Sequence, residues 1–156
     1  MIRDAAESDF EGVLSLIMTM DEYHHQCVPD RIKGAEQARL EPQSFHAQIA
    51  DKSQILLLAL KGGEIVGLAR AQLVDQAEGR AHLARRIALI HEIVVQRDLR
   101  RSGIGKALFN RVRRWANSNS VSTIELNVYD FNDAALKFYN ALGFQCLMRR
   151  LTQVSD

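Results

Sequence analysis

Apolar residues gather in short runs along the chain, and these runs predict the strands of a sheet. The runs 55–60 and 65–74 flank the turn 61–64, which contains two adjacent glycines, and this arrangement predicts a β-hairpin. The run 87–95 is apolar for most of its length, which is typical of a central strand buried on both faces. Shorter strands are expected at 2–5, 124–128 and 145–151.

Helices are predicted where apolar residues recur every three or four positions. The first follows a capping box formed by Ser8 and Glu11, and the second begins at Pro42, which fits the first turn of a helix. The last lies between Asn132, a good N-cap residue, and Gly143, which suits the position after a helix end. The helix before it has an apolar stripe made of Ile104, Leu108, Val112 and Trp115.

The composition is that of an ordinary globular protein. Of 156 residues, 47% are apolar and 25% are charged, so we expect a single α/β domain over residues 1–156. The net charge of +1 gives no general attraction to nucleic acid. We find neither a signal-peptide run nor a membrane span, and Cys27 and Cys146 have no metal-site spacing. A cytoplasmic protein without a metal or a membrane partner is therefore expected.

The segment from Val95 to Lys106 combines a strand end, several basic residues and the start of a helix. A helix start leaves backbone N–H groups without partners and carries the positive end of the helix dipole. Gly103 and Gly105 have no Cβ atom, so an anion can approach these N–H groups closely. Full positive charges are added by Arg100, Arg101 and Lys106. The segment therefore suits a pyrophosphate group.

Two common phosphate loops do not match this segment. A Walker A loop needs a glycine where Arg100 stands and a serine or threonine where Ala107 stands. The dinucleotide-binding fingerprint needs a third glycine where Leu108 stands. A basic, glycine-capped helix start without a ligand is the remaining structural alternative.

The pattern Arg-x-x-Gly-x-Gly at 100–105, between a strand and a helix, resembles the acetyl-CoA signature of the GCN5-related N-acetyltransferases (GNATs), Gln/Arg-x-x-Gly-x-Gly/Ala. The stretch 124–144 resembles the family's other signature, in which an Asn precedes an Ala-rich turn, a Tyr follows and the helix ends in Gly-Phe. The matching residues are Asn132, Ala134, Ala135, Tyr139, Gly143 and Phe144. Both motifs stand in the family's order, and the element order extends the resemblance over nearly the whole chain.

The resemblance implies the GNAT fold, a mixed and mostly antiparallel central sheet flanked by helices, with a V-shaped splay between two central strands. Acetyl-CoA would lie in the wedge between 90–95 and 124–128. Backbone groups near Ile93 and Val95 would pair with the pantetheine amides, and the N–H near Val94 would polarise the thioester carbonyl. The residues implied in cofactor binding are Ile93, Val94, Val95, Arg100, Arg101, Ser102, Gly103, Ile104, Gly105, Lys106, Asn132 and Tyr139.

The implied reaction is direct transfer of the acetyl group to a primary amine through a tetrahedral intermediate. His91 and Glu92 are both candidates for the base, with side chains expected on opposite faces of the strand. We favour His91, because histidine titrates near neutrality whereas glutamate needs its pKa raised by burial. Tyr139 stands where many relatives carry the acid that protonates the CoA thiolate. Each of these residues also has a purely structural alternative. His91 and Glu92 would be hydrogen-bonded polar residues on a buried strand, Tyr139 would pack in the core, and Asn132 would only cap its helix.

The sequence does not identify the acceptor, and a small amine, an amino acid, an aminoglycoside and a protein amine all fit. Two polar segments, 21–41 and 75–86, are expected to form the pocket for the acceptor. In the first, Tyr23, His24 and His25 are expected to form a solvated helix end. The alternative function is an acyl-CoA-binding sensor or interaction module with little turnover, and the balanced charge disfavours a nucleic-acid-binding domain. Small relatives commonly dimerise, so a homodimer is also expected.

Overall fold

The protein is built around a five-stranded sheet whose strands lie side by side in chain order. The computed structural model describes residues 1–153. The strands are β1 (Ile2–Asp4), β2 (Gln54–Lys61), β3 (Glu64–Gln76), β4 (Arg85–Val95) and β5 (Ile124–Leu126). Neighbouring strands are antiparallel, except that β4 and β5 are parallel. The expected mixed, mostly antiparallel sheet and its β2–β3 hairpin are confirmed.

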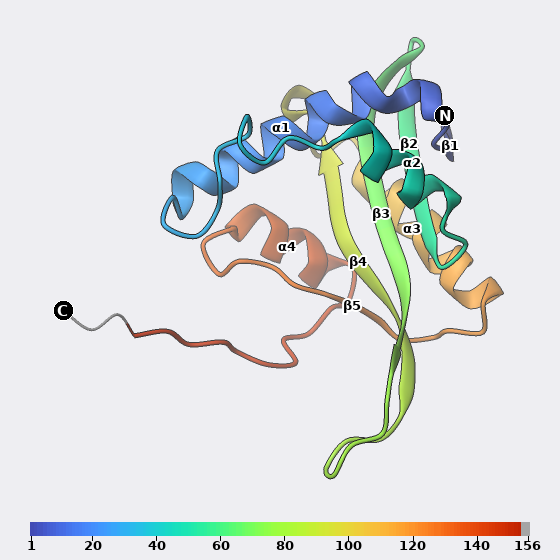
Figure 1. Ribbon diagram of the computed structural model, residues 1–156, viewed down its shortest axis with the longest axis vertical. Coiled ribbons are helices and arrows are strands. Elements are labelled where there is room, and N and C mark those ends of the chain that lie inside the picture. The colour runs from blue at the N-terminus through green and yellow to red at the C-terminus, as the bar shows by residue number, and fades with distance from the viewer. Residues whose placement is uncertain (154–156) are drawn as a thin grey trace.

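Helices cover both faces of this sheet (Figure 1). On one face lie α1 (Phe10–Cys27) and α2 (Pro42–Ala50), and on the other lie α3 (Ile104–Ser118) and α4 (Asp133–Ala141). Short 3₁₀ turns, η1 (Glu7–Asp9) and η2 (Arg97–Leu99), precede α1 and follow β4. Pro42 begins α2, and the Asn132 side chain accepts a hydrogen bond from the Ala135 N–H at the start of α4, as expected.

Each face of the sheet has its own apolar layer, because side chains alternate between the two faces along a strand. The layer beneath α1 and α2 contains Val13, Leu16, Phe45, Leu56, Leu58, Leu68 and Val94. The layer beneath α3 contains Leu57, Ala59, Val66, Ala69, Ala71, Ile90, Leu108, Phe109 and Val112. Of the expected α3 stripe, Leu108 and Val112 are fully buried and fix α3 against the middle of the sheet. The other two members, Ile104 and Trp115, are half-buried.

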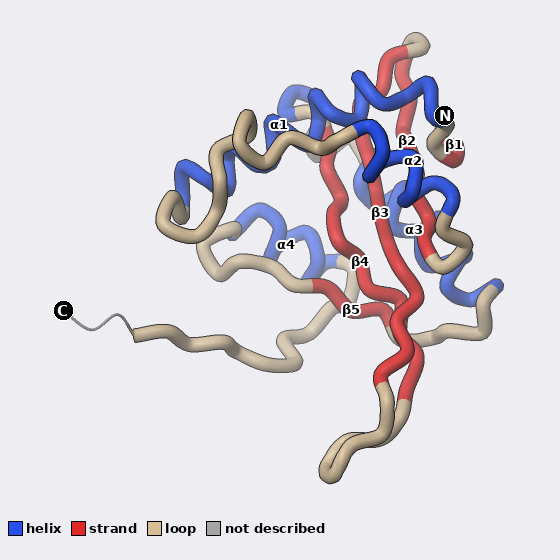
Figure 2. The backbone as a smooth tube through the Cα atoms, in the orientation of Figure 1, coloured by secondary structure: helices blue, strands red, loops and turns tan. Residues whose placement is uncertain are grey.

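β4 and β5 pair over a very short distance. Residues 88–90 pair with Ile124–Leu126, and β4 then continues to Val95 while the chain after β5 turns toward α4 (Figure 2). In the described chain, the edge of residues 91–95 that faces away from β3 has no strand beside it. This is the splay that the resemblance implied.

The closing strand expected at 145–151 is wrong. This segment is extended but pairs with no strand in the described chain. Its large apolar side chains are exposed, with Leu147 at 77%, Met148 at 79% and Leu151 at 88%. Alternation of apolar and polar residues expresses a local preference for extended backbone, whereas a strand needs a neighbouring edge with which to pair.

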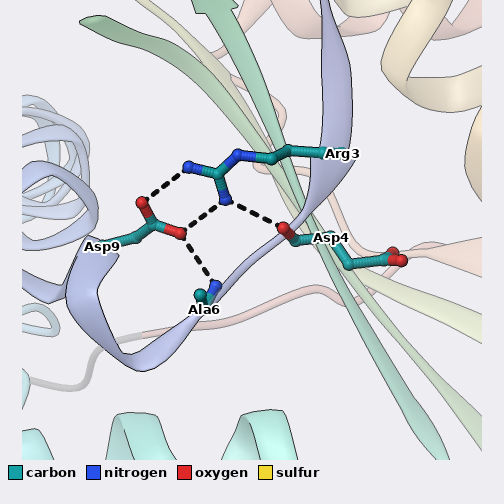
Figure 3. A network of polar contacts seen from close by, with 4 residues as sticks. All are labelled: Arg3, Asp4, Ala6 and Asp9. Carbon is teal, nitrogen blue, oxygen red and sulfur yellow. Dashed lines mark hydrogen bonds and ion pairs between the residues drawn. The ribbon is translucent and has the colours of Figure 1, made fainter. Parts of the chain in front are cut away.

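The N-terminus of α1 is held by Asp9, and the capping box expected from Ser8 and Glu11 is wrong. One Asp9 oxygen accepts hydrogen bonds from the Ala6 N–H at 2.8 Å and from Arg3 Nη1 at 2.7 Å, and the other accepts from Arg3 Nη2 at 2.8 Å (Figure 3). Arg3 belongs to β1, so this buried carboxylate joins the start of the helix to the edge of the sheet. Asp9 reaches back to the N–H at the start of η1, and no side chain caps the first turn of α1 itself, so the sequence rule placed the cap at the wrong residues.

We expect Asp9→Ala to lower the free energy of unfolding by about 1–2 kcal/mol, because the Ala6 N–H and Arg3 lose their acceptor. Glu7→Ala, an exposed neighbour, is the matched control and should change stability little. The Arg3 hydrogen bonds lower the pKa of Asp9, so its contribution is present above the pKa of an unfolded aspartate, about 3.9. That contribution is lost as the pH falls through the lower folded pKa. Urea unfolding at pH 7 and pH 3 measures this; a wild-type-to-variant difference that stays constant would contradict it.

Candidate functional site

The loop between β4 and α3 presents backbone N–H groups to open space. Arg101 at φ +62° and Gly103 at φ +89° turn the chain from η2 into the helix. A Cβ at Gly103 would meet nothing within 4 Å, so glycine is needed here for its conformation. The Ala107 N–H donates to the Gly103 carbonyl, and the N–H groups before it have no acceptor within α3. This geometry can receive an anion.

The basic side chains expected around this loop are all exposed. Arg100, Arg101 and Lys106 lie at its surface, where their charges can reach a bound anion. Arg100 Nε also donates to the Val95 carbonyl at 3.3 Å, which links the loop to the end of β4. Ser102 Oγ donates to the Leu99 carbonyl at 2.6 Å, so this hydroxyl closes the turn.

Gly105 has a packing role that the sequence did not indicate. A Cβ on Gly105 would lie 3.2 Å from Phe138 Cζ and 3.8 Å from Val95 Cγ2. The missing side chain therefore lets the Phe138 ring of α4 approach the first turn of α3. Ile104, beside it, is half-buried and packs against the α3-side core.

The last residues of β4 divide their side chains between the two apolar layers. Ile93 and Val95 pack toward α3, whereas Val94 is buried beneath α1. Side chains that point above and below the sheet leave the backbone edge free for hydrogen bonding. The splay places this edge beside the opening between β4 and β5.

A β-bulge at His91 overturns the expectation that His91 and Glu92 lie on opposite faces. Glu92 pairs with Arg70 and Ile90 pairs with Ala71, so His91 is an extra residue in β4. A bulge of this kind interrupts the strict alternation of side chains. His91 Nε2 lies 3.3 Å from Gln72 Oε1, and Glu92 contacts Arg70, two residues from Gln72 on the same strand. His91 and Glu92 therefore share the α1 face of the sheet.

Glu92 is bound by Arg70 through two hydrogen bonds. Arg70 Nε donates to one carboxylate oxygen at 2.8 Å, and Nη2 donates to the other at 3.1 Å. The positive charge of Arg70 also acts on His91. Partial burial, followed by this charge, lowers the pKa of His91, and the negative charge of Glu92 offsets the effect in part. His91 is therefore neutral at pH 7 and able to accept a proton.

Side chains from both faces of the sheet approach Glu92 near the splay. Burial, followed by the negative charge of Glu92, raises the pKa of Asp21 on α1. The same two causes raise the pKa of Tyr139 on α4 to about 12, so its phenol stays protonated. The Tyr139 ring packs at 5.1 Å from Phe138 and 5.5 Å from Phe144 between ring centroids. Tyr139 thus belongs to the α4 packing and also lies within electrostatic range of the polar cluster.

Sequence reasoning missed Asp21 and Arg70. Arg70 gave a usable signal, since it is a lone charge within the apolar run of a predicted strand and such a charge needs a partner. Asp21 gave none, because it is one of several acidic residues at the start of a polar segment. Only the path of α1 over the sheet brings Asp21 toward β4.

An aromatic cluster joins the end of α1 to the loop after β5, and the solvated helix end expected for His24 is wrong. His24 lies 5.7 Å from Tyr129 and 6.2 Å from Phe131 between ring centroids, and Tyr23 lies 6.2 Å from Phe131. Burial lowers the pKa of His24. His25 Nδ1 lies 2.6 Å from the Ile32 carbonyl, so this ring holds the loop after α1 by a hydrogen bond.

Residues 1–153 contain neither a metal-binding cluster nor a helix suited to a membrane. No group of three or more histidine, cysteine or carboxylate side chains there could hold a metal ion. No helix in the same part of the chain combines the length and the apolar character needed to cross a bilayer.

Comparison with known proteins agrees with this geometry. A model of the acetyltransferase (GNAT) family matches residues 17–144. An uncharacterized N-acetyltransferase of Methanocaldococcus jannaschii is 43% identical over 61 residues, which are 39% of this chain and 27% of the relative. The thialysine N-epsilon-acetyltransferase of Bos taurus is 28% identical over 152 residues, 94% of this chain and 85% of the relative. The chain thus spans about a quarter of the first relative and most of the second.

A solved structure has nearly the same fold. A mutant of a Bacillus halodurans protein superposes with a TM-score of 0.94 at 28% identity, over 99% of both chains. The family match extends from the middle of α1 to Phe144 and includes both sequence motifs, the splay and the loop before α3. The chain therefore belongs to the GNAT family of acetyl-CoA-dependent N-acetyltransferases.

Proposed function

We propose that the single domain formed by this chain transfers the acetyl group of acetyl-CoA directly to a primary amine that arrives as a cation. The observation that supports this most is the splay itself, which opens beside the N–H groups of the loop before α3 and beside His91, Glu92 and Tyr139. A thioester held along β4 would place its reacting carbon between the two faces of the sheet. Both a base and an acid would then be within reach.

The proposed cofactor site combines three elements. The pyrophosphate would lie on the N–H groups around Gly103, with Arg100, Arg101 and Lys106 supplying positive charge. The pantetheine amides would pair with the open edge of β4 near Ile93 and Val95. The N–H near Val94 would donate to the thioester oxygen as negative charge develops there.

The amine side of the reaction is assigned to the α1 face. Arg70 pairs with Glu92, and the negative charge of Glu92 also acts on Asp21, so two carboxylates share a cluster with a single guanidinium and the cluster carries excess negative charge. An ammonium group relieves this repulsion, which favours a cationic acceptor. Neutral His91 would take the proton from the amine as its nitrogen attacks the thioester carbon. Glu92 is the rival base, although both of its oxygens already accept from Arg70.

Collapse of the tetrahedral intermediate breaks the carbon–sulfur bond and releases CoA as a thiolate. Tyr139 is assigned to protonate this sulfur, because its phenol keeps its proton throughout the neutral range. Asn132 caps α4 and so fixes the helix that carries Tyr139.

The acceptor would enter between α1 and the loop after β5. The aromatic cluster of Tyr23, His24, Tyr129 and Phe131 lies there and can pack against the aliphatic part of a substrate. The name of the bovine relative supports testing thialysine first. A panel that adds lysine, a polyamine, an aminoglycoside and a peptide would follow, with release of free CoA thiol as the measurement. No release with any amine in the presence of bound acetyl-CoA would favour the sensor alternative.

Removing the proposed base should slow the reaction without weakening CoA binding. We expect His91→Gln to lower kcat/KM roughly a hundredfold or more. In the wild type, the acidic limb of the pH profile of kcat/KM should lie below about 6.5, because the pKa of His91 is lowered and the base must be neutral. If Glu92→Gln removes this limb and His91→Gln leaves it in place, Glu92 is the base.

The charge of Arg70 should be measurable at His91 without any substrate. We expect Arg70→Met to raise the pKa of His91, because a nearby positive charge is removed and Glu92 loses its partner. Titration of the imidazole Cε1–H signals by NMR measures this. His24 is the internal control, since burial alone lowers its pKa and that value should stay constant. An unchanged pKa at His91 would mean that Arg70 does not act on the base.

Loss of the Tyr139 hydroxyl should affect the leaving group. We expect Tyr139→Phe to lower kcat roughly ten- to a hundredfold, at the low end of general-acid effects because a thiolate leaves tolerably unaided. The ring packing should persist, and the KM for acetyl-CoA should change little. Tyr129→Phe makes the same chemical change at an exposed position and should reduce kcat less. Near-wild-type kcat in Tyr139→Phe, with chemistry rate-limiting, would return Tyr139 to a packing role.

A further inference from the structure

A pocket lies between the β1–β2 edge of the sheet and the second half of α3. Its volume is about 520 Å³, which is within the range of sites that bind small molecules. Its walls come from the sheet and the helix, and the residues that line it are Asp4, Gln54, Ile55, Arg111, Arg114, Trp115 and Ser118. In the strand order β2 and β3 separate β1 from β4, so this pocket, which we call the α3 pocket, lies apart from the splay.

Helical spacing brings the α3 side chains to this pocket. Counted from Arg111, the residues Arg114, Trp115 and Ser118 follow after three, four and seven positions, so all of them lie along one face of the helix. At 1.5 Å per residue, Arg114 is roughly 15 Å along the helix axis from the loop before α3. The α3 pocket and the loop therefore lie at opposite ends of the same helix.

The carboxylate of Asp4 faces the same pocket from the sheet. Asp4 pairs with Leu57 across the β1–β2 ladder, and Leu57 belongs to the layer beneath α3. Directly paired residues share a face of the sheet, so the Asp4 side chain lies on the α3 face. Figure 3 shows this carboxylate pointing away from Arg3 and Asp9, so it takes no part in their ion pair.

The charged groups of the α3 pocket have no charged partner within the described chain. In residues 1–153, Asp4, Arg111 and Arg114 form no ion pair. Arg111 is nevertheless half-buried, and a charge that is partly withdrawn from water needs a compensating group. The α3 pocket therefore offers two guanidinium groups and one carboxylate to a ligand.

The α3 pocket also has an apolar wall. Trp115 and Ile55 line it and pack against the core on the α3 side of the sheet. An indole ring and a branched aliphatic side chain can cover a short hydrocarbon chain. The pocket thus combines charged groups of both signs with apolar surface.

We propose that the α3 pocket binds an amino acid with an acidic side chain, such as glutamate, as a ligand that is not a substrate of acetyl transfer. Its two carboxylates would pair with Arg111 and Arg114, and its ammonium group would pair with Asp4. Its methylene groups would lie against Trp115 and Ile55. A simple anion would leave Asp4 without a partner and a simple cation would leave both arginines without one, so a ligand that carries both charges is favoured.

The first test uses Trp115 as a direct reporter, because it is the single tryptophan of the chain. We expect glutamate to change the tryptophan fluorescence saturably in the absence of acetyl-CoA. Glutamine lacks one carboxylate and glutarate lacks the amine, so each should bind roughly tenfold more weakly or worse, through loss of a charge-assisted hydrogen bond. No saturable change with glutamate, or an equal affinity for either analogue, would overturn the proposal.

The second test locates the ligand with variants of the pocket. Arg114→Gln and Asp4→Asn should each weaken glutamate binding roughly tenfold or more. Arg113→Gln is the matched control and should bind as the wild type does, since Arg113 is exposed outside the pocket, with its guanidinium 6.0 Å from the centroid of the Phe109 ring. Circular dichroism checks that the variants are folded. Wild-type affinity in either pocket variant would overturn the proposal.

A variant of the proposed transfer site separates the two sites. His91→Gln should bind glutamate as the wild type does, because His91 lies on β4 and on the α1 face of the sheet. Loss of glutamate binding in His91→Gln would place the ligand at the transfer site and overturn the proposal. None of these measurements uses turnover, so their failure leaves the proposed acetyl transfer standing, and absence of acetyl transfer would leave the glutamate site standing.

Discussion

The brief pairing of β4 with β5 is the constraint on which the site depends. Backbone N–H and C=O groups inside a fold need partners, and a strand that leaves its neighbour after three residues creates an edge that some other group must satisfy. A ligand that carries amides of its own is the natural partner for such an edge. If β5 ran farther beside β4, the backbone of β5 would occupy that edge of β4. The chain could then not turn away after β5 to place α4 beside α3. The loop before α3 would then face a closed sheet.

Arg70 is the second organising feature, because it joins the two candidate bases in one electrostatic system. It neutralises Glu92, it helps to keep His91 uncharged, and it leaves Asp21 as the carboxylate whose pKa is raised. One guanidinium in the middle of β3 thus gives neighbouring groups different protonation behaviour. Enzymes of many kinds separate acids from bases by placing charges unequally around them.

Local signals predicted the helices, the hairpin and the glycine-rich turn, because caps, periodicity and turn residues act over a few positions. The same reasoning failed for His91 and Glu92, because a bulge depends on the register with β3 and neighbouring residues do not reveal it. It failed for the segment after α4 because pairing needs an edge elsewhere in space. Asp21 and the environment of His24 were invisible for a related reason, since the direction of a long helix decides what its end touches.

The bulge at His91 also affects how this chain can change in length. Insertions and deletions within a strand usually turn every following side chain to the other face, which would bring apolar residues to water. His91 is the one residue of β4 without a counterpart on β3, so its deletion would leave Glu92 opposite Arg70 and Val94 facing the core beneath α1. β4 therefore has a position where one residue can be lost without a change of register. The core would keep its order after such a loss, whereas the proposed chemistry would lose its base.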